Sequence, residues 1–230
     1  MGNLEPRILF EDNHLLIINK KAGDLAQGDA TGDIPLIDSL KEFIKVRDHK
    51  PGNVYLGLVH RLDRPTSGLL IFAKTSKALS RMNELFKTRE VEKSYWAIVE
   101  GKPEKQSDHL EHYLKKNQKN NKVTVFTRPT PDAKKAILEY KVVGNLDNYT
   151  LLEVDLFTGR SHQIRSQLSF IGHSIKGDLK YGSKRSNPDG SISLHARRIK
   201  FIHPVSHEEI EITAPPPNDN VWNDCLKFVD

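Results

Sequence analysis

The sequence predicts an α+β fold with a largely antiparallel sheet, and two observations lead to that class. Short segments with alternating or continuous apolar residues, typical of strands, recur along nearly the whole chain. Apolar residues at helical spacing are confined to a few segments between them. Because strands dominate and do not alternate regularly with helices, an antiparallel sheet is favoured over a parallel one.

In the first third of the chain, RILFEDNHLLIINK (7–20) predicts two strands separated by a turn, followed by a loop at 22–33. PLIDSLKEFIKVR (35–47) predicts a helix with one apolar face. Two apolar runs of strand length follow, VYLGLV (54–59) and GLLIFAK (68–74). The charged stretch between these runs is therefore expected to be a loop that joins two buried strands.

The middle of the chain predicts one helix, one strand and one polar segment. TSKALSRMNELFKTR (75–89) has helical spacing and can be capped by Thr75 or Ser76. EKSYWAIVEG (92–101) has the pattern of a strand. The lysine-rich segment 102–122 predicts a long surface loop or a weak hairpin. A solvated, disordered insertion is an equally good interpretation of its charges.

The C-terminal half follows from the same two patterns. A helix is expected within TGRSHQIRSQLSFIGH (158–173), which Gly172 would end. The run PPP at 215–217 is expected to halt regular structure. Strands are expected at 136–144, 149–157, 193–204 and 208–214.

Composition limits the classes of protein that fit. With 230 residues, 37% of them hydrophobic, the chain can bury a substantial core in one domain or two closely packed lobes. Its net charge of +5 favours an anionic partner over a cationic one. One cysteine, Cys225, permits no internal disulfide, so a reducing cytoplasmic environment is expected. No apolar run reaches the length of about 18 residues that a membrane span needs.

The densest group of ionisable residues is HRLDRPTSG (60–68), in which His60, Arg61 and Arg64 surround Asp63. Nearby positive charge favours the ionised form of a carboxylate, which can act as a nucleophile. The alternative is structural, with Asp63 paired to Arg64 or capping the following turn. On this loop alone the structural interpretation is favoured, because structural ion pairs are commoner than catalytic ones.

Two further segments carry candidate functional residues. In GRSHQIR, Arg160 leads into a helix on which His162 and Arg165 lie three residues apart, away from the apolar stripe. The start of a helix attracts anions, so this element suits a phosphate or a carboxylate, although a solvated polar face is the alternative. Tyr95, in the strand at 92–101, can stack on a base or pack in the core, and packing is the commoner role.

HRLDRPTSGLLIFAKT (60–75) closely resembles the sequence around the catalytic aspartate of the RluA family of pseudouridine synthases, which convert uridine to pseudouridine in RNA. Other segments match the family in the same order, namely ILFEDNHLLIINKKAG, EKSYWAIVEG, GRSHQIRSQLSFIGHSIKGDLKYG and LHARRIKFIHP. The resemblance implies the pseudouridine synthase fold, a mostly antiparallel mixed sheet bent into two halves with flanking helices and an RNA-binding cleft. It implies a single catalytic domain over 1–230, and no N-terminal S4 RNA-binding domain is expected.

The resemblance also implies roles for individual residues. Asp63 is the nucleophile that attacks the target nucleoside, after which the uracil N1–C1′ bond breaks and the base rejoins through C5. Arg165 pairs with Asp63, and Tyr95 packs against the target base. Arg61 is implied to contact RNA and to help fill the space left by the flipped nucleotide. The remaining residues expected to bind RNA are His60, Arg64, Arg160 and His162.

The chain departs from the family where it has Ser166 and Gln167, which we expect on the packing side or the RNA side of the helix. The implied partner is structured RNA, either ribosomal or transfer RNA. No metal or organic cofactor is implied, because a redox-neutral isomerisation needs only nucleophilic, acid–base and electrostatic help. No membrane and no protein partner is implied either. We expect a cytoplasmic monomer.

Two alternatives come from other classes of protein. A glycoside hydrolase also attacks an anomeric carbon, but it normally needs two carboxylates that flank the bond, and the HRLDRPTSG motif offers one. A non-catalytic RNA-binding or ribosome-assembly protein would use the same basic surface without the reaction. Replacing Asp63 by Asn would separate these readings, since a pure binder keeps its function.

Overall fold

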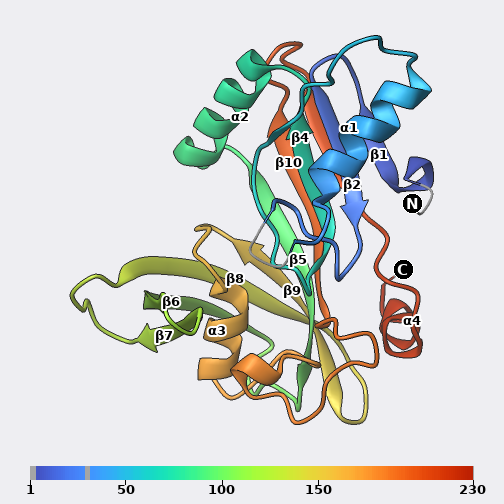
Figure 1. The fold of residues 1–230 in the computed structure, drawn as a ribbon. Coiled ribbons are helices and arrows are strands. Elements are labelled where there is room, and N and C mark those ends of the chain that lie inside the picture. The colour runs from blue at the N-terminus through green and yellow to red at the C-terminus, as the bar shows by residue number, and fades with distance from the viewer. Residues whose placement is uncertain (1–3, 29–31, 230) are drawn as a thin grey trace. The chain divides into compact units, whose positions relative to one another are not determined.

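The computed structural model describes residues 4–28 and 32–229, which form two compact units. Unit 1 comprises 1–91 and 198–215, and unit 2 comprises 92–197 and 216–230 (Figure 1). Of the loop expected at 22–33, residues 29–31 lie outside the described residues, and the expectation of a single domain stays a prediction.

The described residues confirm the α+β class. Eleven strands belong to one sheet and are accompanied by four α-helices. Strand β10 (Leu194–Ile202) contributes its first part to unit 2 and its second part to unit 1. The pairings of β1 with β2, β2 with β4, β5 with β9 and β8 with β9 are all antiparallel, as expected. No helix in the described ranges is both long and apolar enough to cross a bilayer.

Unit 1 is built on the strand order β1-β2-β4-β10, with β3 beside β4 and β11 beside β10. Its helices are α1 (Leu36–Arg47), α2 (Ser76–Thr88) and the 3-10 helix η1 (Glu5–Arg7). Its other strands are β1 (Ile8–Glu11), β2 (Leu15–Lys20), β3 (Gly57–Leu58), β4 (Ser67–Ala73) and β11 (Glu209–Thr213).

The core of unit 1 lies between α1 and the sheet. Leu40 and Ile44 of α1 are fully buried together with Leu16, Ile18 and Leu70 of the strands. Burying an aliphatic side chain of this size contributes about 1.5–3 kcal/mol to stability. The apolar face predicted from the sequence therefore holds the helix against the sheet. Figure 1 shows α1 lying along the strands of this unit.

In unit 1, the start of α2 and the extent of β3 differ in detail from what the sequence predicted. Thr75, rather than Ser76, caps α2, because its hydroxyl accepts from the Ala78 N–H at 3.1 Å. The expected strand at 54–59 is wrong for most of its length. Within this segment only Gly57 and Leu58, the strand β3, pair with β4. A side chain at Gly57 would meet Leu79 at 2.6 Å, so the helix α2 packs directly on this short strand.

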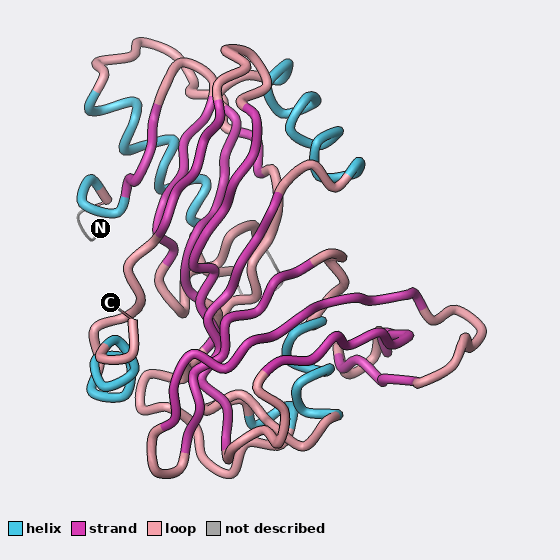
Figure 2. The backbone as a smooth tube through the Cα atoms, turned by 180° about the vertical axis from the view of Figure 1, so that it is seen from behind, coloured by secondary structure: helices cyan, strands magenta, loops and turns pink. Residues whose placement is uncertain are grey.

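Unit 2 has the antiparallel strand order β5-β9-β8-β6-β7. Figure 2 draws its strands in magenta. Its helices are α3 (Gln163–Phe170), α4 (Asn220–Leu226) and the 3-10 helix η2 (Leu179–Tyr181). Its strands, besides the first part of β10, are β5 (Glu92–Glu100), β6 (Ser107–Asn117), β7 (Lys122–Phe126), β8 (Lys134–Asn145) and β9 (Tyr149–Leu156).

The lysine-rich segment is an ordered hairpin, so the interpretations as a loop or a disordered insertion are wrong. Strands β6 and β7 pair from Tyr113 to Asn117, and β6 also pairs with β8. On β6 the side chains of Leu110, His112 and Leu114 are buried at alternate positions. The buried face of β6 packs against α3, and this contact stabilises the hairpin.

The proline run does not end regular structure, because α4 follows it. Asp219 caps this helix by accepting from the backbone N–H groups of Val221 and Trp222. Trp222 and Cys225 are buried in a cluster with Trp96. Burial raises the pKa of the Cys225 thiol to about 11, so the thiol is largely protonated and unreactive at neutral pH.

Candidate active site

The loop that joins β3 to β4 in unit 1 carries Asp63, which is half-buried. A turn orders the loop, because the Thr66 N–H donates to the Asp63 carbonyl at 3.0 Å. Arg64 donates to the Asp33 carboxylate at 2.6 Å and to the Gly23 carbonyl at 3.1 Å. Arg64 thus has Asp33 as a carboxylate partner and ties this loop to the segment that precedes α1. A pair between Asp63 and Arg64 stays an untested alternative.

Beneath the loop, at the end of β2, lies the fully buried side chain of Lys20. Its ammonium donates to the carbonyl oxygens of Thr66 (2.7 Å), Lys21 (3.0 Å), Arg64 (3.1 Å) and Asp63 (3.4 Å). Burial lowers the pKa of Lys20 to about 8. Because one cation gathers four carbonyl groups, three of them from the loop, it fixes the backbone from which Asp63 projects.

Sequence reasoning missed Lys20. It ends the run LLIINK, where a lysine is ordinarily a solvated strand end. In the sheet it faces Gly68 of β4, in a strand whose neighbouring residues are almost all buried. The only local signal was a strand with no polar face on which a lysine could be solvated.

His60 and Arg61, which precede Asp63 in the loop, differ in their surroundings. The His60 ring stacks on Phe86 at 5.1 Å between centroids, and its Nε2 accepts from the Ile71 N–H at 3.3 Å. His60 is therefore held by packing within unit 1. Arg61 is exposed and forms no ion pair among the described residues. Of the two, Arg61 has the side chain suited to an outside anion.

Arg165, on α3 in unit 2, is buried at 6% exposure, so the alternative of a solvated polar face is wrong. Its Nε and Nη2 donate to the two oxygens of Asp178, at 2.6 and 2.9 Å. Its guanidinium also lies over the ring of Tyr181, 5.1 Å from the centroid. This bidentate pair fixes the plane of the guanidinium. Asp178, which sequence reasoning did not single out, is thus the group that orients Arg165.

His162 and Arg160 precede α3 and are fixed in different ways. His162 is buried, has a backbone φ of 50°, and places its Nδ1 2.8 Å from the Tyr181 hydroxyl. Arg160 is half-buried, and its Nε donates to the Lys135 carbonyl of β8 at 3.0 Å. His162 is therefore part of the core of unit 2, whereas Arg160 lies at its surface.

Ser166 and Gln167 lie on the packing side of α3, as one of the two expectations had it. Ser166 donates from its hydroxyl to the Gln163 carbonyl at 3.1 Å, and Gln167 donates to the Nδ1 of His112 at 2.9 Å. Burial lowers the pKa of His112, which suits a neutral ring that accepts this bond. The departure from the family pattern thus belongs to the contact between α3 and β6.

Tyr95, on β5 in unit 2, is 8% exposed and faces Val154 of β9 in the sheet register. Asp63 belongs to unit 1, whereas Tyr95 and Arg165 belong to unit 2. Since each unit is described by itself, the ion pair between Asp63 and Arg165 stays a prediction, as do the assigned roles of the site residues.

Comparison with known proteins identifies the class. The RNA pseudouridylate synthase family matches residues 14–170. Ribosomal large subunit pseudouridine synthase C of Vibrio cholerae is 34% identical, over 94% of this chain and 67% of its own. An uncharacterized RNA pseudouridine synthase of Chlorobaculum parvum is 36% identical, over 92% of this chain and 71% of its own. Human RNA pseudouridylate synthase domain containing 4 has a TM-score of 0.80 at 25% identity, covering 98% of this chain and 94% of its own.

The α+β fold and the matches over most of the chain define an RNA-modifying isomerase. The chain belongs to the RNA pseudouridylate synthase family, which confirms the resemblance read from the motifs. It is therefore an enzyme that isomerises uridine in RNA.

Proposed function

We propose that this enzyme makes pseudouridine at specific sites of ribosomal RNA, with Asp63 as the nucleophile. The observation that carries the proposal is the setting of Asp63, a half-buried carboxylate on a loop whose backbone is held by the buried ammonium of Lys20. A fixed loop keeps the reacting carboxylate in one geometry, as nucleophilic catalysis requires. Two relatives named for the large ribosomal subunit favour ribosomal over transfer RNA as the substrate.

In the proposed reaction, Asp63 attacks the target nucleoside and the N1–C1′ bond of the uridine breaks. The uracil turns, its C5 bonds to C1′, and the bond between Asp63 and the nucleoside breaks, which frees the carboxylate again. The proton on C5 leaves and N1 gains one, so the reaction is redox-neutral and atoms balance. The detached uracil must be kept from escaping, which calls for a pocket that excludes water.

Arg165 is proposed to stabilise the ionised form of Asp63. Its guanidinium is buried and oriented by Asp178, so its N–H groups point in a fixed direction. Tyr95 is proposed to pack against the target base. That base must leave its stack, at a cost of a few kcal/mol that contacts with neighbouring phosphates offset.

Cationic residues supply those contacts in the proposal. Arg61 and Arg160 are suited by exposure or by lack of a carboxylate partner among the described residues. Arg64 would exchange its partner Asp33 for a phosphate. His60 and His162, which are held by internal contacts, would act on RNA through the shape of the loop and of the helix start. We place the enzyme in the cytoplasm as a monomer.

The test is chemical mapping of pseudouridine in ribosomal and transfer RNA from cells with and without the gene. We expect at least one ribosomal site to disappear, and to return with the wild-type gene but not with Asp63→Asn. The matched control is Asp38→Asn, which changes an exposed carboxylate on α1 paired to Lys41.

Three results would count against the proposal. Sites lost only from transfer RNA would refute the substrate, and full complementation by Asp63→Asn would refute the nucleophile. A phenotype of the deletion that Asp63→Asn corrects without restoring any pseudouridine would favour the non-catalytic RNA-binding alternative. Binding of the purified Asp63→Asn protein to RNA should equal that of the wild type, because the substitution removes no cation.

A further inference from the structure

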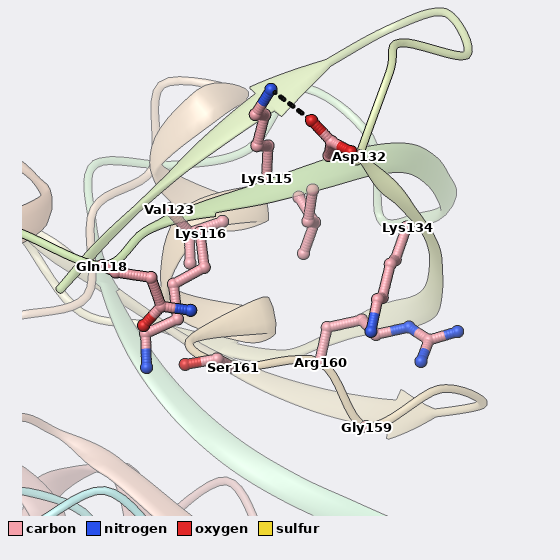
Figure 3. A pocket seen from close by; sticks show the side chains of 10 residues that line it. Lys115, Lys116, Gln118, Val123, Asp132, Lys134, Gly159, Arg160 and Ser161 are labelled. Carbon is pink, nitrogen blue, oxygen red and sulfur yellow. Dashed lines mark hydrogen bonds and ion pairs between the residues drawn. The ribbon is translucent and has the colours of Figure 1, made fainter.

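A cavity of about 540 Å³ lies under the β6–β7 hairpin of unit 2. It is lined from β6, β7, β8 and the loop at 159–161 that leads into α3 (Figure 3). This volume falls within the range of about 300–1,000 Å³ that is usual for small-molecule sites. Of the residues proposed above to contact RNA, Arg160 alone lines this cavity.

The charged residues that line the cavity are mostly positive. Lys115 is neutralised by Asp132, at 3.1 Å. Lys116, Lys134 and Arg160 also line the cavity, and none of them has a carboxylate partner in the part of the chain that the structure describes. Three uncompensated cations around one hollow repel one another, and an anion with more than one charge relieves that repulsion.

The wall that carries Arg160 is held in place. The side-chain Oε1 of Gln163 accepts from the Arg160 N–H at 3.0 Å and from the Thr158 hydroxyl at 2.8 Å. The Arg160 Nε is bound by the Lys135 carbonyl, and its two Nη groups have no acceptor among the described residues. The guanidinium is thus anchored through its Nε, while its two Nη groups can donate to a phosphate.

The floor of the cavity is apolar. Leu114 and Val123 line it and belong to a buried cluster with Ala136 and Tyr181. A ribose or a base face can lie on such a floor while phosphates reach the cations at the rim. A free inorganic anion would leave the floor unused, and a sugar–phosphate chain uses both features.

We propose that this cavity binds the sugar–phosphate backbone of the substrate RNA, one or two nucleotides at a time, through Lys116, Lys134 and Arg160. The inference rests on the proposed function, since RNA is the substrate there. Arg160 lies five residues before Arg165 on the same loop and helix, so the cavity anchors RNA on the element that carries the proposed catalytic arginine. It is a site that sets which RNA segment the enzyme holds.

The test measures binding of a fluorescein-labelled oligouridylate by fluorescence anisotropy over a series of KCl concentrations. The pocket variant is the double substitution Lys116→Ala and Lys134→Ala. The control is Lys102→Ala with Lys141→Ala, which removes the same two charges from exposed, unpaired positions of the same unit. Because each phosphate contact on a single strand contributes about 0.7 to the slope of log K against log salt, the pocket variant should lose about 1.4 and the control nothing.

A pocket variant with the wild-type slope, or a control that loses as much, would overturn the proposal. Poly-glutamate is the second probe. If the pocket variant loses affinity for poly-glutamate but not for oligouridylate, the cavity is a docking site for an acidic protein and the proposal is wrong. Thermal unfolding of all variants shows that they fold. Equilibrium binding needs no turnover, so failure of the Asp63 proposal would leave this result standing.

Discussion

The buried lysine under the Asp63 loop makes a prediction about stability that can be worked out from its pKa. Replacing Lys20 by Met keeps most of the side-chain volume and removes the titrating group. In the folded chain burial lowers the pKa of Lys20 to about 8, against an ordinary value of 10.5. At 1.36 kcal/mol per pH unit, the difference corresponds to about 3 kcal/mol of unfolding free energy.

The sign follows from proton binding. Below pH 8 the lysine is protonated in both states, and the folded state carries the full cost of burying the charge. Between pH 8 and 10.5 the unfolded chain holds a proton that the folded chain has released, so stability rises with pH in this window. The unfolding free energy of the wild type, relative to Lys20→Met, should therefore increase by about 3 kcal/mol from pH 8 to 10.5.

The assay is urea unfolding followed by far-UV circular dichroism at several pH values across that window. Lys77→Met is the control, because Lys77 is exposed on α2 and should follow the wild-type curve. A constant difference between wild type and Lys20→Met at all pH values would refute the reasoning. It would mean that the carbonyl groups of the loop stabilise the ammonium enough to cancel the cost of its burial.

Three other predictions concern single contacts. Asp178→Asn leaves Arg165 buried without its carboxylate partner, so the free energy of unfolding measured in urea should fall by about 3–5 kcal/mol. Activity should also fall further than it does in the control Asp38→Asn. Unchanged stability would contradict the importance of the pair between Arg165 and Asp178. Thr75→Ala removes the cap of α2 and should cost about 0.5–2 kcal/mol, whereas Ser76→Ala should cost less. Cys225, whose pKa burial raises to about 11, should resist iodoacetamide at pH 8 until urea unfolds the chain, and rapid labelling of the folded protein would show that the thiol is not buried.

The sequence predicted most elements wherever burial follows a regular period. Strand β4 is buried at every position, and the continuous apolar run GLLIFAK predicted it. Strand β6 was harder, because the residue between Leu110 and Leu114 on its buried face is His112. His112 is accommodated there by its bond to Gln167, which lies 55 residues further along the chain, and by an edge contact with Phe170. No local pattern carries that information.

The residues of the candidate site also fall into two groups, those that a local motif predicted and those that only tertiary contacts reveal. Asp63, Tyr95 and Arg165 could be selected because their motifs resemble those of a family, and motifs are local. Lys20 and Asp178 act by holding the loop and the arginine, and their partners come from other elements. Supporting residues of this kind are defined by tertiary contacts, so the sequence marked them only as an ordinary lysine and an ordinary aspartate.

The tyrosine of η2 gives unit 2 a mechanical link. The hydroxyl of Tyr181 accepts from the Val123 N–H of β7 at 2.9 Å, while its ring lies under the guanidinium of Arg165. A pull on the hairpin that shifted β7 would strain this bond and tilt the ring beneath the arginine. If RNA binds under the hairpin as proposed, a load on β7 would thus be transmitted to the arginine that we propose to act on Asp63.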